Sequence, residues 1–225
     1  MRDERSKPKQ GGSHAHTSDG HRSRDRGAVG GRAGAAFQNG SFEAGVSLTN
    51  YLALPGDSTA ITGWTVGGSS SNTNVIDYIG SYWTAQDGSR SIDLDGFNTA
   101  GSIFQAFDTA IGQAYRVDFW LAGNPDSGAA VKSVQVAAAG TSADYSFDTT
   151  GRTKSAMGWV MESFSFIASA TSTTLSFTSL CTTGCSWGPA IDNVSVTAVP
   201  EASTYAMLLA GLGLMGFLGR RRMRT

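Results

Sequence analysis

Any catalysis by the body of this chain would have to proceed without histidine. All three histidines, His14, His16 and His21, lie in the first 36 residues. Serine–histidine–aspartate triads, cysteine–histidine pairs and histidine-ligated zinc sites all depend on an imidazole that titrates near neutral pH. No glycine-rich stretch ends in the Gly-Lys-Ser/Thr of a phosphate-binding loop. The sequence therefore argues against enzymes of those classes.

Carboxylates are the remaining side chains that could do acid–base chemistry. Asp93 and Asp95 lie two positions apart in SIDLDG, so on a strand both would share one face while Ile92 and Leu94 face the core. One interpretation is an acid–nucleophile pair of the kind that hydrolyses glycosides, or a cation site. The alternative is the solvated face of a sheet, with Asp95-Gly96 opening a turn. The pattern favours this alternative.

Aromatic side chains in polar loops form the best candidate ligand site. Sugars stack their C–H faces on tryptophan and tyrosine, while neighbouring polar groups fix the hydroxyls. One such cluster follows Gly80, and a further tryptophan lies beside Gly188-Pro189. The residues predicted to contact a ligand are Tyr82, Trp83, Asp87, Arg90 and Trp187. The alternative for the aromatic residues is packing at the rim of the domain, and packing is also what we expect of Trp64, Trp120 and Trp159.

The elements that would position these residues are predicted to be strands. In Tyr115–Leu121, every second residue (Tyr115, Val117, Phe119, Leu121) is apolar, and Arg116 and Asp118 occupy the other face. Nine such runs, separated by Gly, Asn, Asp and Ser, predict strands at Ile61–Val66, Val75–Ile79, Ser91–Leu94, Ser102–Phe107, Ala114–Leu121, Val131–Ala138, Val160–Ile167, Thr173–Leu180 and Ala190–Thr197. This spacing indicates an all-β antiparallel sandwich.

Charge divides the chain into three parts. Residues 1–36 hold eight basic and four acidic side chains with almost nothing apolar, which predicts a disordered basic segment. Residues 37–198 hold five basic and thirteen acidic side chains, and we expect them to form one sandwich domain. Residues 199–225 are net basic. The acidic body argues against nucleic acid as a partner, because phosphates favour Lys and Arg.

The C-terminal 27 residues predict a membrane helix. Ala202–Gly219 carries no charge and stops at an arginine cluster, Arg220, Arg221 and Arg222. As a helix this segment would reach about 27 Å, close to the ~30 Å of a hydrocarbon core. The arginines would remain cytoplasmic, which places the body outside. The alternatives are an ordinary anchor helix and a buried soluble helix.

The same segment resembles a PEP-CTERM sorting signal: a Pro-Glu box (Val199, Pro200, Glu201), an apolar helix and a terminal arginine cluster. Ala202 stands where the second proline of the box is expected. The resemblance implies a Gram-negative bacterium, a precursor held transiently in the inner membrane, and an exosortase that cleaves near the box. The protein would then reach the cell surface or extracellular matrix.

The N-terminus provides no signal peptide to match such a tail. A signal peptide needs an apolar run of about 7–15 residues, and residues 1–36 contain none. We expect that residues 1–36 are a misannotated start, and that the true precursor carries a signal peptide just before Phe37.

Cys181 and Cys185 are the only cysteines and enclose Thr-Thr-Gly. An exported compartment favours a disulfide between them, with a reactive thiol pair as the alternative. So small a ring would contribute only about 2 kcal/mol. We also expect the bond to help hold Trp187 in position.

A second resemblance covers nearly all of the body. NGSFEAG, ITGWTV, DYIGSYWTAQDGSRSIDLDG, GQAYRVDFWLAGNP and GPAIDNVSV, in this order, resemble the choice-of-anchor C family of bacterial surface domains. The resemblance implies a galactose-binding-like jelly roll and no catalytic residues. Such jelly rolls often tie their first strand to their last with a structural calcium ion, which would here be held by Glu43 and Asp192. Otherwise these two carboxylates would accept hydrogen bonds from backbone amides at strand ends.

Three functions compete at this point. The first is a non-enzymatic surface protein that binds carbohydrate, such as exopolysaccharide. The second is a glycan-active enzyme that uses carboxylates alone, although no carboxylate pair stands out. The third is binding to ice or crystal surfaces through Thr174, Ser176 and Thr178, and a single hydroxyl row makes this weak. A purely structural surface protein is a further alternative.

Overall fold

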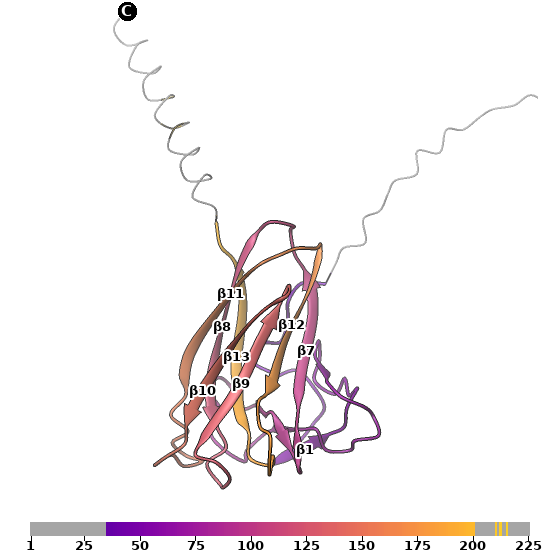
Figure 1. The fold of residues 1–225 in the computed structure, drawn as a ribbon, viewed down its shortest axis with the longest axis vertical. Coiled ribbons are helices and arrows are strands. Elements are labelled where there is room, and N and C mark those ends of the chain that lie inside the picture. The colour runs from indigo at the N-terminus through magenta and orange to yellow at the C-terminus, as the bar shows by residue number, and fades with distance from the viewer. Residues whose placement is uncertain (1–34, 201–209, 211, 213–214, 216–225) are drawn as a thin grey trace, which may run out of the picture. The chain divides into compact units, whose positions relative to one another are not determined.

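The structure, a computed structural model, describes residues 35–200 together with Ala210, Leu212 and Met215 (Figure 1). The predicted basic segment therefore lies almost wholly outside the described residues. The same holds for Glu201, for the arginines Arg220, Arg221 and Arg222, and for most of the predicted membrane helix. Within the described part of the chain, no helix has the length and apolar character that a membrane span requires.

Among the described residues, thirteen strands build two facing antiparallel sheets and a small hairpin (Figure 1). Their bounds are β1 Tyr51–Leu54, β2 Thr65–Val66, β3 Ile76–Ile79, β4 Ser91–Asp93, β5 Asp95–Gly96, β6 Thr99–Ala100, β7 Ser102–Asp108, β8 Ala114–Gly123, β9 Val131–Ala138, β10 Thr141–Asp148, β11 Val160–Ile167, β12 Ser172–Ser179 and β13 Pro189–Ala198. One sheet has the order β1-β3-β4-β13-β8-β11, and the other has the order β10-β9-β12-β7-β2. The predicted all-β antiparallel sandwich is confirmed.

All nine predicted strands exist, most with ends shifted by one or two residues. The exception is Ile61–Val66, of which only Thr65 and Val66 are extended, because Trp64 N donates to Ile61 O (3.0 Å) and closes a turn. Two four- to eight-residue strands were not predicted. These are the edge strands β1 and β10.

The core lies between the two sheets and is rich in aromatic rings. Phe119 of β8 and Phe177 of β12 meet edge to face with centroids 5.2 Å apart, and both side chains are fully buried. Trp64 packs against Phe177 and Phe42 and is 2% exposed, so its predicted place in the core is confirmed. Such pairs hold the two sheets in one fixed relation.

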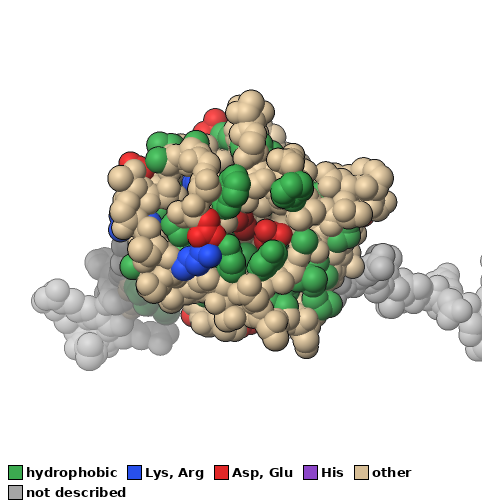
Figure 2. Space-filling view, turned by 90° about the horizontal axis from the view of Figure 1, so that it is seen from below, with side chains coloured by type: hydrophobic (Ala, Val, Ile, Leu, Met, Phe, Trp, Pro, Cys, Tyr) green, Lys and Arg blue, Asp and Glu red, His purple; other side chains and the backbone are tan. Residues whose placement is uncertain are grey.

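Strands β3, β4 and β13 lie together within the first sheet, and the loops at one end of them carry the polar and aromatic residues of interest. In Figure 1, β13 runs from the lower end of the sandwich to the upper end. The segments that enter β3 and β13 and the one that leaves β8 therefore meet at the lower end. Figure 2 looks at this end directly and shows acidic side chains in a hollow that hydrophobic side chains surround.

Candidate functional site

Two carboxylates lie side by side on the outer face of the first sheet. Asp77 of β3 and Asp93 of β4 are cross-strand partners. Their neighbours in sequence, including Tyr78 and Ile92, are fully buried in the core, so the two aspartates face the other way. Side chains at paired positions of antiparallel strands are direct neighbours. The register of β3 on β4 therefore brings together two acids that are sixteen positions apart in the sequence.

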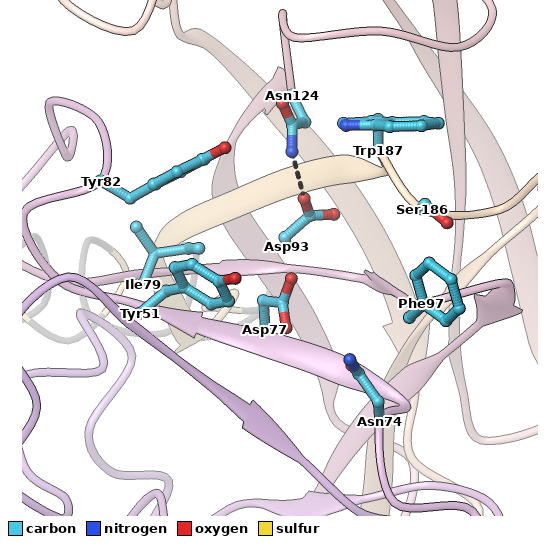
Figure 3. A pocket seen from close by; sticks show the side chains of 10 residues that line it. All are labelled: Tyr51, Asn74, Asp77, Ile79, Tyr82, Asp93, Phe97, Asn124, Ser186 and Trp187. Carbon is cyan, nitrogen blue, oxygen red and sulfur yellow. Dashed lines mark hydrogen bonds between the residues drawn. The ribbon is translucent and has the colours of Figure 1, made fainter.

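These two carboxylates lie in a cavity of about 190 Å³ at the lower end of the sandwich (Figures 2 and 3). Figure 3 shows both pointing into the cavity, with aromatic rings on either side. The lining residues come from β1, β3, β4 and the loops around them, and they are Tyr51, Asn74, Asp77, Ile79, Tyr82, Asp93, Phe97, Asn124, Ser186 and Trp187. We call this space the first cavity.

Asp93 forms the base of the first cavity and organises the loops above it. Its Oδ2 accepts a hydrogen bond from Asn124 Nδ2 (2.8 Å), and its Oδ1 accepts from the backbone N–H groups of Asp95 (3.1 Å) and Gly188 (2.9 Å). A Cβ on Gly188 would lie 2.5 Å from Asp93 Oδ1, so only glycine fits there. Complete burial raises the pKa of Asp93 to about 8. Asp93 thus has a positioning role.

Asp77 and Asn74 offer acceptor atoms that have no donor. Asp77 Oδ1 and Asn74 Oδ1 are buried, and neither has a hydrogen-bond partner within the described part of the chain. Burial raises the pKa of Asp77 to about 6. A buried acceptor without a donor costs free energy, and a ligand hydroxyl that donates to it recovers that cost. The base of the first cavity is therefore suited to a ligand rich in hydroxyl groups.

Aromatic rings form opposite walls of the first cavity (Figure 3). Tyr51 and Tyr82 meet at a centroid distance of 5.3 Å on one side. Phe97 and Trp187 lie on the other side and are 71% and 36% exposed, so their faces are open to a ligand. One hydrogen bond joins the segments that carry these two rings. Asn98 N, next to Phe97, donates to the Oγ of Ser186 (2.9 Å), which precedes Trp187.

Tyr82 is held by an ion pair outside the first cavity. Its hydroxyl donates to Asp126, which also pairs with Lys154 Nζ (2.9 Å). The same ammonium lies 3.8 Å from the centroid of the Tyr82 ring, a cation–π contact. Burial is the largest cause of the raised pKa of the Tyr82 hydroxyl. These contacts hold the Tyr82 ring in place.

The five predicted ligand-binding residues divide into two groups. Tyr82 and Trp187 line the first cavity. Trp83, Asp87 and Arg90 do not line it. Burial corrects the prediction for Trp83, and ligand contact by Asp87 and Arg90 stays a prediction. Trp83 is 4% exposed and donates from Nε1 to Ser91 Oγ (2.8 Å), so it packs inside the domain.

Asp87 and Arg90 lie in the loop between β3 and β4, where their hydrogen bonds hold them outside the lining of the first cavity. Arg90 donates from Nη1 to Val46 O (2.8 Å) and to Tyr78 Oη (2.7 Å), and its guanidinium lies 5.1 Å from the Tyr78 ring centroid. Asp87 is anchored by its backbone N–H to Asp192 Oδ2 (3.0 Å). Both residues therefore hold the loop in place.

Glu43 and Asp192, the predicted calcium ligands, are each surrounded by hydrogen-bond donors. Glu43 Oε1 accepts from the backbone N–H groups of Ser89 and Arg90 (both 2.7 Å). Asp192 accepts from the backbone N–H groups of Gln86 (2.8 Å), Asp87 and Asn193. Burial raises the pKa of Asp192 to about 7. This is the alternative arrangement, in which the two carboxylates bind backbone amides.

Chelation tests the calcium hypothesis. Because N–H donors already occupy Glu43 and Asp192, we expect EDTA to leave the unfolding temperature of the full chain unchanged, as measured by circular dichroism. Added CaCl₂ should not raise it either. A lower unfolding temperature in EDTA, restored by calcium, would show that an ion replaces these hydrogen bonds.

Asp95 lies close to Cys181 and Cys185, which are in the loop that precedes Trp187. Cys181 and Cys185 form the predicted disulfide, with their Cα atoms 5.7 Å apart. Asp95 is 2% exposed, so the interpretation of Asp93 and Asp95 as a solvated face is wrong. Within the described part of the chain, Asp95 and the cysteines form the one group of three potential metal ligands, with ligand atoms within 4.8 Å of one another. The disulfide removes both thiolates from such a site.

Several residues that line the first cavity were not predicted from the sequence, above all Asp77, Asn74, Asn124, Tyr51 and Phe97. Alternation in β3 could have placed Asp77 on the outer face, because its neighbours Ile76 and Tyr78 are apolar. Nothing in the sequence gives its pairing with Asp93.

The raised pKa of Asp77 predicts a pH-dependent effect of Asp77→Asn. The carboxyl titrates near 3.8 in the unfolded chain and at about 6 in the folded protein, so the folded state binds the proton more tightly. This stabilisation is complete below about pH 4 and is lost as the pH rises through about 6. Asparagine cannot ionise, so we expect Asp77→Asn to raise the unfolding temperature at about pH 7.5 and to change it little at about pH 4.

Thermal unfolding of both proteins at the two pH values measures this difference. The control is Asp108→Asn, an exposed position at the end of β7, which should shift the unfolding temperature equally at both pH values. An Asp77→Asn protein that is less stable than the parent at about pH 7.5 would contradict the expected desolvation of Asp77.

Two family models match consecutive parts of the chain. Residues 35–197 match the model described as "Protein of unknown function (DUF642)". Residues 198–222 match the PEP-CTERM protein-sorting motif, as the C-terminal resemblance predicted. The choice-of-anchor C family does not appear in these matches, so that resemblance stays a prediction.

Similar proteins are found among curated sequences and among solved structures. Halomucin of Haloquadratum walsbyi (strain DSM 16790 / HBSQ001) is 34% identical over 179 residues, which is 74% of this chain and 2% of halomucin. The chain therefore spans only a small part of this relative. TmCBM61, solved in complex with beta-1,4-galactotriose, is 18% identical with a TM-score of 0.46, and the match covers 73% of this chain and 99% of that one. CBM35 from Paenibacillus barcinonensis is 20% identical with a TM-score of 0.41, covering 61% and 94%.

Proposed function

The chain belongs to the DUF642 family, whose description assigns no function, and from its site we propose that it is a surface protein that binds carbohydrate. The ligand is a glycan with free hydroxyl groups, bound in the first cavity. Binding is non-enzymatic and takes place after export.

One observation carries this proposal: unpartnered acceptors lie between exposed aromatic faces. Asp77 Oδ1 and Asn74 Oδ1 lack donors, and Trp187 and Phe97 offer open rings beside them. A sugar presents both partners at once, because its C–H faces are apolar and its equatorial hydroxyls donate hydrogen bonds. A purely apolar ligand would leave the carboxylate of Asp77 unsatisfied.

A carboxylate-based glycan hydrolase is the second candidate, because Asp77 and Asp93 are neighbours and both have a raised pKa. Two features weigh against it. Glycosidase carboxylates flank the scissile bond, whereas these two lie side by side on adjacent strands. Asp93 also already accepts three hydrogen bonds that hold the loops at the base of the first cavity.

The sorting motif supports location at the cell surface. It follows the sandwich without a spacer, since β13 ends at Ala198 and the motif begins at the same residue. Val199 N still donates to Ala114 O (2.8 Å), so the folded domain extends to the Pro-Glu box. We infer that an exosortase processes the chain near Pro200 from a membrane-held precursor and releases the sandwich to extracellular polysaccharide.

A glycan array probed with the full chain tests the proposal. We expect binding to at least one class of hydroxyl-rich glycan, lost in Asp77→Ala and retained in Asp108→Ala. Incubation with the bound glycan should release no reducing ends, and release of them would favour the hydrolase. Absence of binding across the array would leave a structural role as the better interpretation.

A further inference from the structure

A second cavity of about 440 Å³ lies on the other side of Trp187. Trp187 lines both cavities, so its side chain separates them. The residues of the second cavity that matter here are Asp95, Ser127, Lys132, Ser179, Thr182 and Trp187. Its volume lies in the range typical of small-molecule sites, which is about 300–1,000 Å³.

Asp95 supplies an unsatisfied acceptor to the second cavity. It is 2% exposed, and its Oδ1 has no hydrogen-bond partner within the described part of the chain. Burial is the largest cause of its raised pKa. A buried carboxylate oxygen of this kind can accept a hydrogen bond from a ligand in the second cavity.

Lys132 supplies donors to the same cavity. It is 5% exposed, and its Nζ donates to Ser127 O (2.8 Å). An ammonium group has three N–H bonds, so two remain for a ligand. Among the described residues no carboxylate lies within ion-pair distance of Lys132 Nζ. Gly128 closes over this region, because a Cβ there would lie 3.2 Å from Lys132 Nζ and 3.5 Å from the Trp187 ring.

We propose that the second cavity is a second subsite, which binds a neutral sugar unit of the same glycan on the far side of Trp187. This inference rests on the proposed function of the first cavity. A hydroxyl group is both donor and acceptor, so one hydroxyl can donate to Asp95 while a neighbouring one accepts from Lys132. One carboxylate and one ammonium cancel in charge, which favours a neutral unit. An acidic sugar would meet the carboxylate of Asp95.

Two subsites on either side of one ring require a ligand longer than one sugar unit. The glycan would cross the exposed edge of Trp187, with units in both cavities. Affinity should therefore rise steeply with chain length until both cavities are filled. A site with a single cavity would gain little from the added units.

Titration calorimetry of the full chain with neutral oligosaccharides tests this. The probes are mono-, di- and tetrasaccharides derived from β-galactan, β-glucan, β-mannan and β-xylan, with galacturonates of the same lengths as the acidic comparison. We expect the tetrasaccharide of the recognised type to bind at least about tenfold more tightly than the disaccharide. Asp95→Asn and Lys132→Met, which keep side-chain size, should each remove most of that gain and leave the affinity for the shortest ligand unchanged.

Thr182→Trp adds a test that does not alter a buried group, because Thr182 is exposed at the rim of the second cavity. It should block the gain by filling the space. The matched control is Thr59→Trp, an exposed position that lines neither cavity and should bind like the parent.

The outcomes separate the two proposals. If the parent binds none of the probes, the proposed function and the second subsite both fail. If Asp77→Asn weakens binding but Asp95→Asn, Lys132→Met and Thr182→Trp do not, only the second subsite is overturned. If oligogalacturonate gains more from length than the neutral series does, the assignment of a neutral unit is wrong.

Discussion

Replacing Trp187 by alanine is expected to lower glycan affinity by at least about 30-fold. This ring is the one side chain that lines both cavities, so its loss removes a stacking surface on each side. Tryptophan at the centre of a binding surface commonly contributes 2 kcal/mol or more, and about 2 kcal/mol corresponds to roughly 30-fold in affinity. Titration calorimetry with the tetrasaccharide of the recognised glycan measures the effect.

The same change should leave the fold intact. Trp187 is 36% exposed and lies outside the hydrophobic core, so we expect the unfolding temperature to shift by only a few degrees. The control is Trp120→Ala, a half-buried tryptophan of β8 that lines neither cavity and should bind like the parent. If the Trp187→Ala protein binds the glycan with parental affinity, Trp187 is not part of the binding site.

Replacing Trp83 by alanine should instead lower the free energy of unfolding by about 3 kcal/mol or more. Trp83 is 4% exposed within the core and bonds to Ser91 Oγ, so alanine leaves a large void and an unpaired hydroxyl. Chemical denaturation followed by circular dichroism measures the loss. A loss under about 1 kcal/mol would show that the ring is not packed as described.

Trp83→Phe separates packing from ligand contact. Phenylalanine keeps an aromatic ring beside Tyr82, whose centroid lies 5.7 Å from that of Trp83. We expect reduced stability and parental glycan affinity. If Trp83→Phe loses affinity as Trp187→Ala does, the ligand contact predicted from the sequence around Trp83 was right.

Strands with clear alternation were predictable, and two of the four edge strands were not. In β8 every second residue from Tyr115 to Leu121 is apolar, because the strand packs one face on the core, and in β11 Phe164 and Phe166 alternate with serines. The bounds of both strands were predicted to within two residues. Edge strand β10 alternates only over Ala143, Tyr145 and Phe147, and its outward positions are small or polar. Edge strand β1 is too short for a period to show.

The candidate site was predicted in part. Tyr82 and Trp187 stood out because aromatic residues are unusual in polar, glycine-bounded loops. Trp83 has the same local sequence, yet it points into the core. Both residues lie in the irregular loop between β3 and β4, where no period tells from the sequence which side chain points inward.

The amino-acid sequence by itself determined the fold class, the disulfide and the sorting motif. Each depends on local pattern: alternation, the only two cysteines, and an ordered tail. The tertiary structure alone decided that Asp77 faces Asp93, that donors surround Glu43 and Asp192, and that one tryptophan separates two cavities. Those facts depend on strand register and on loops far apart in the sequence that meet in the fold, such as those of Asp93 and Gly188, which are 95 residues apart. Register is an outcome of packing the whole sandwich, so no short stretch of sequence encodes it.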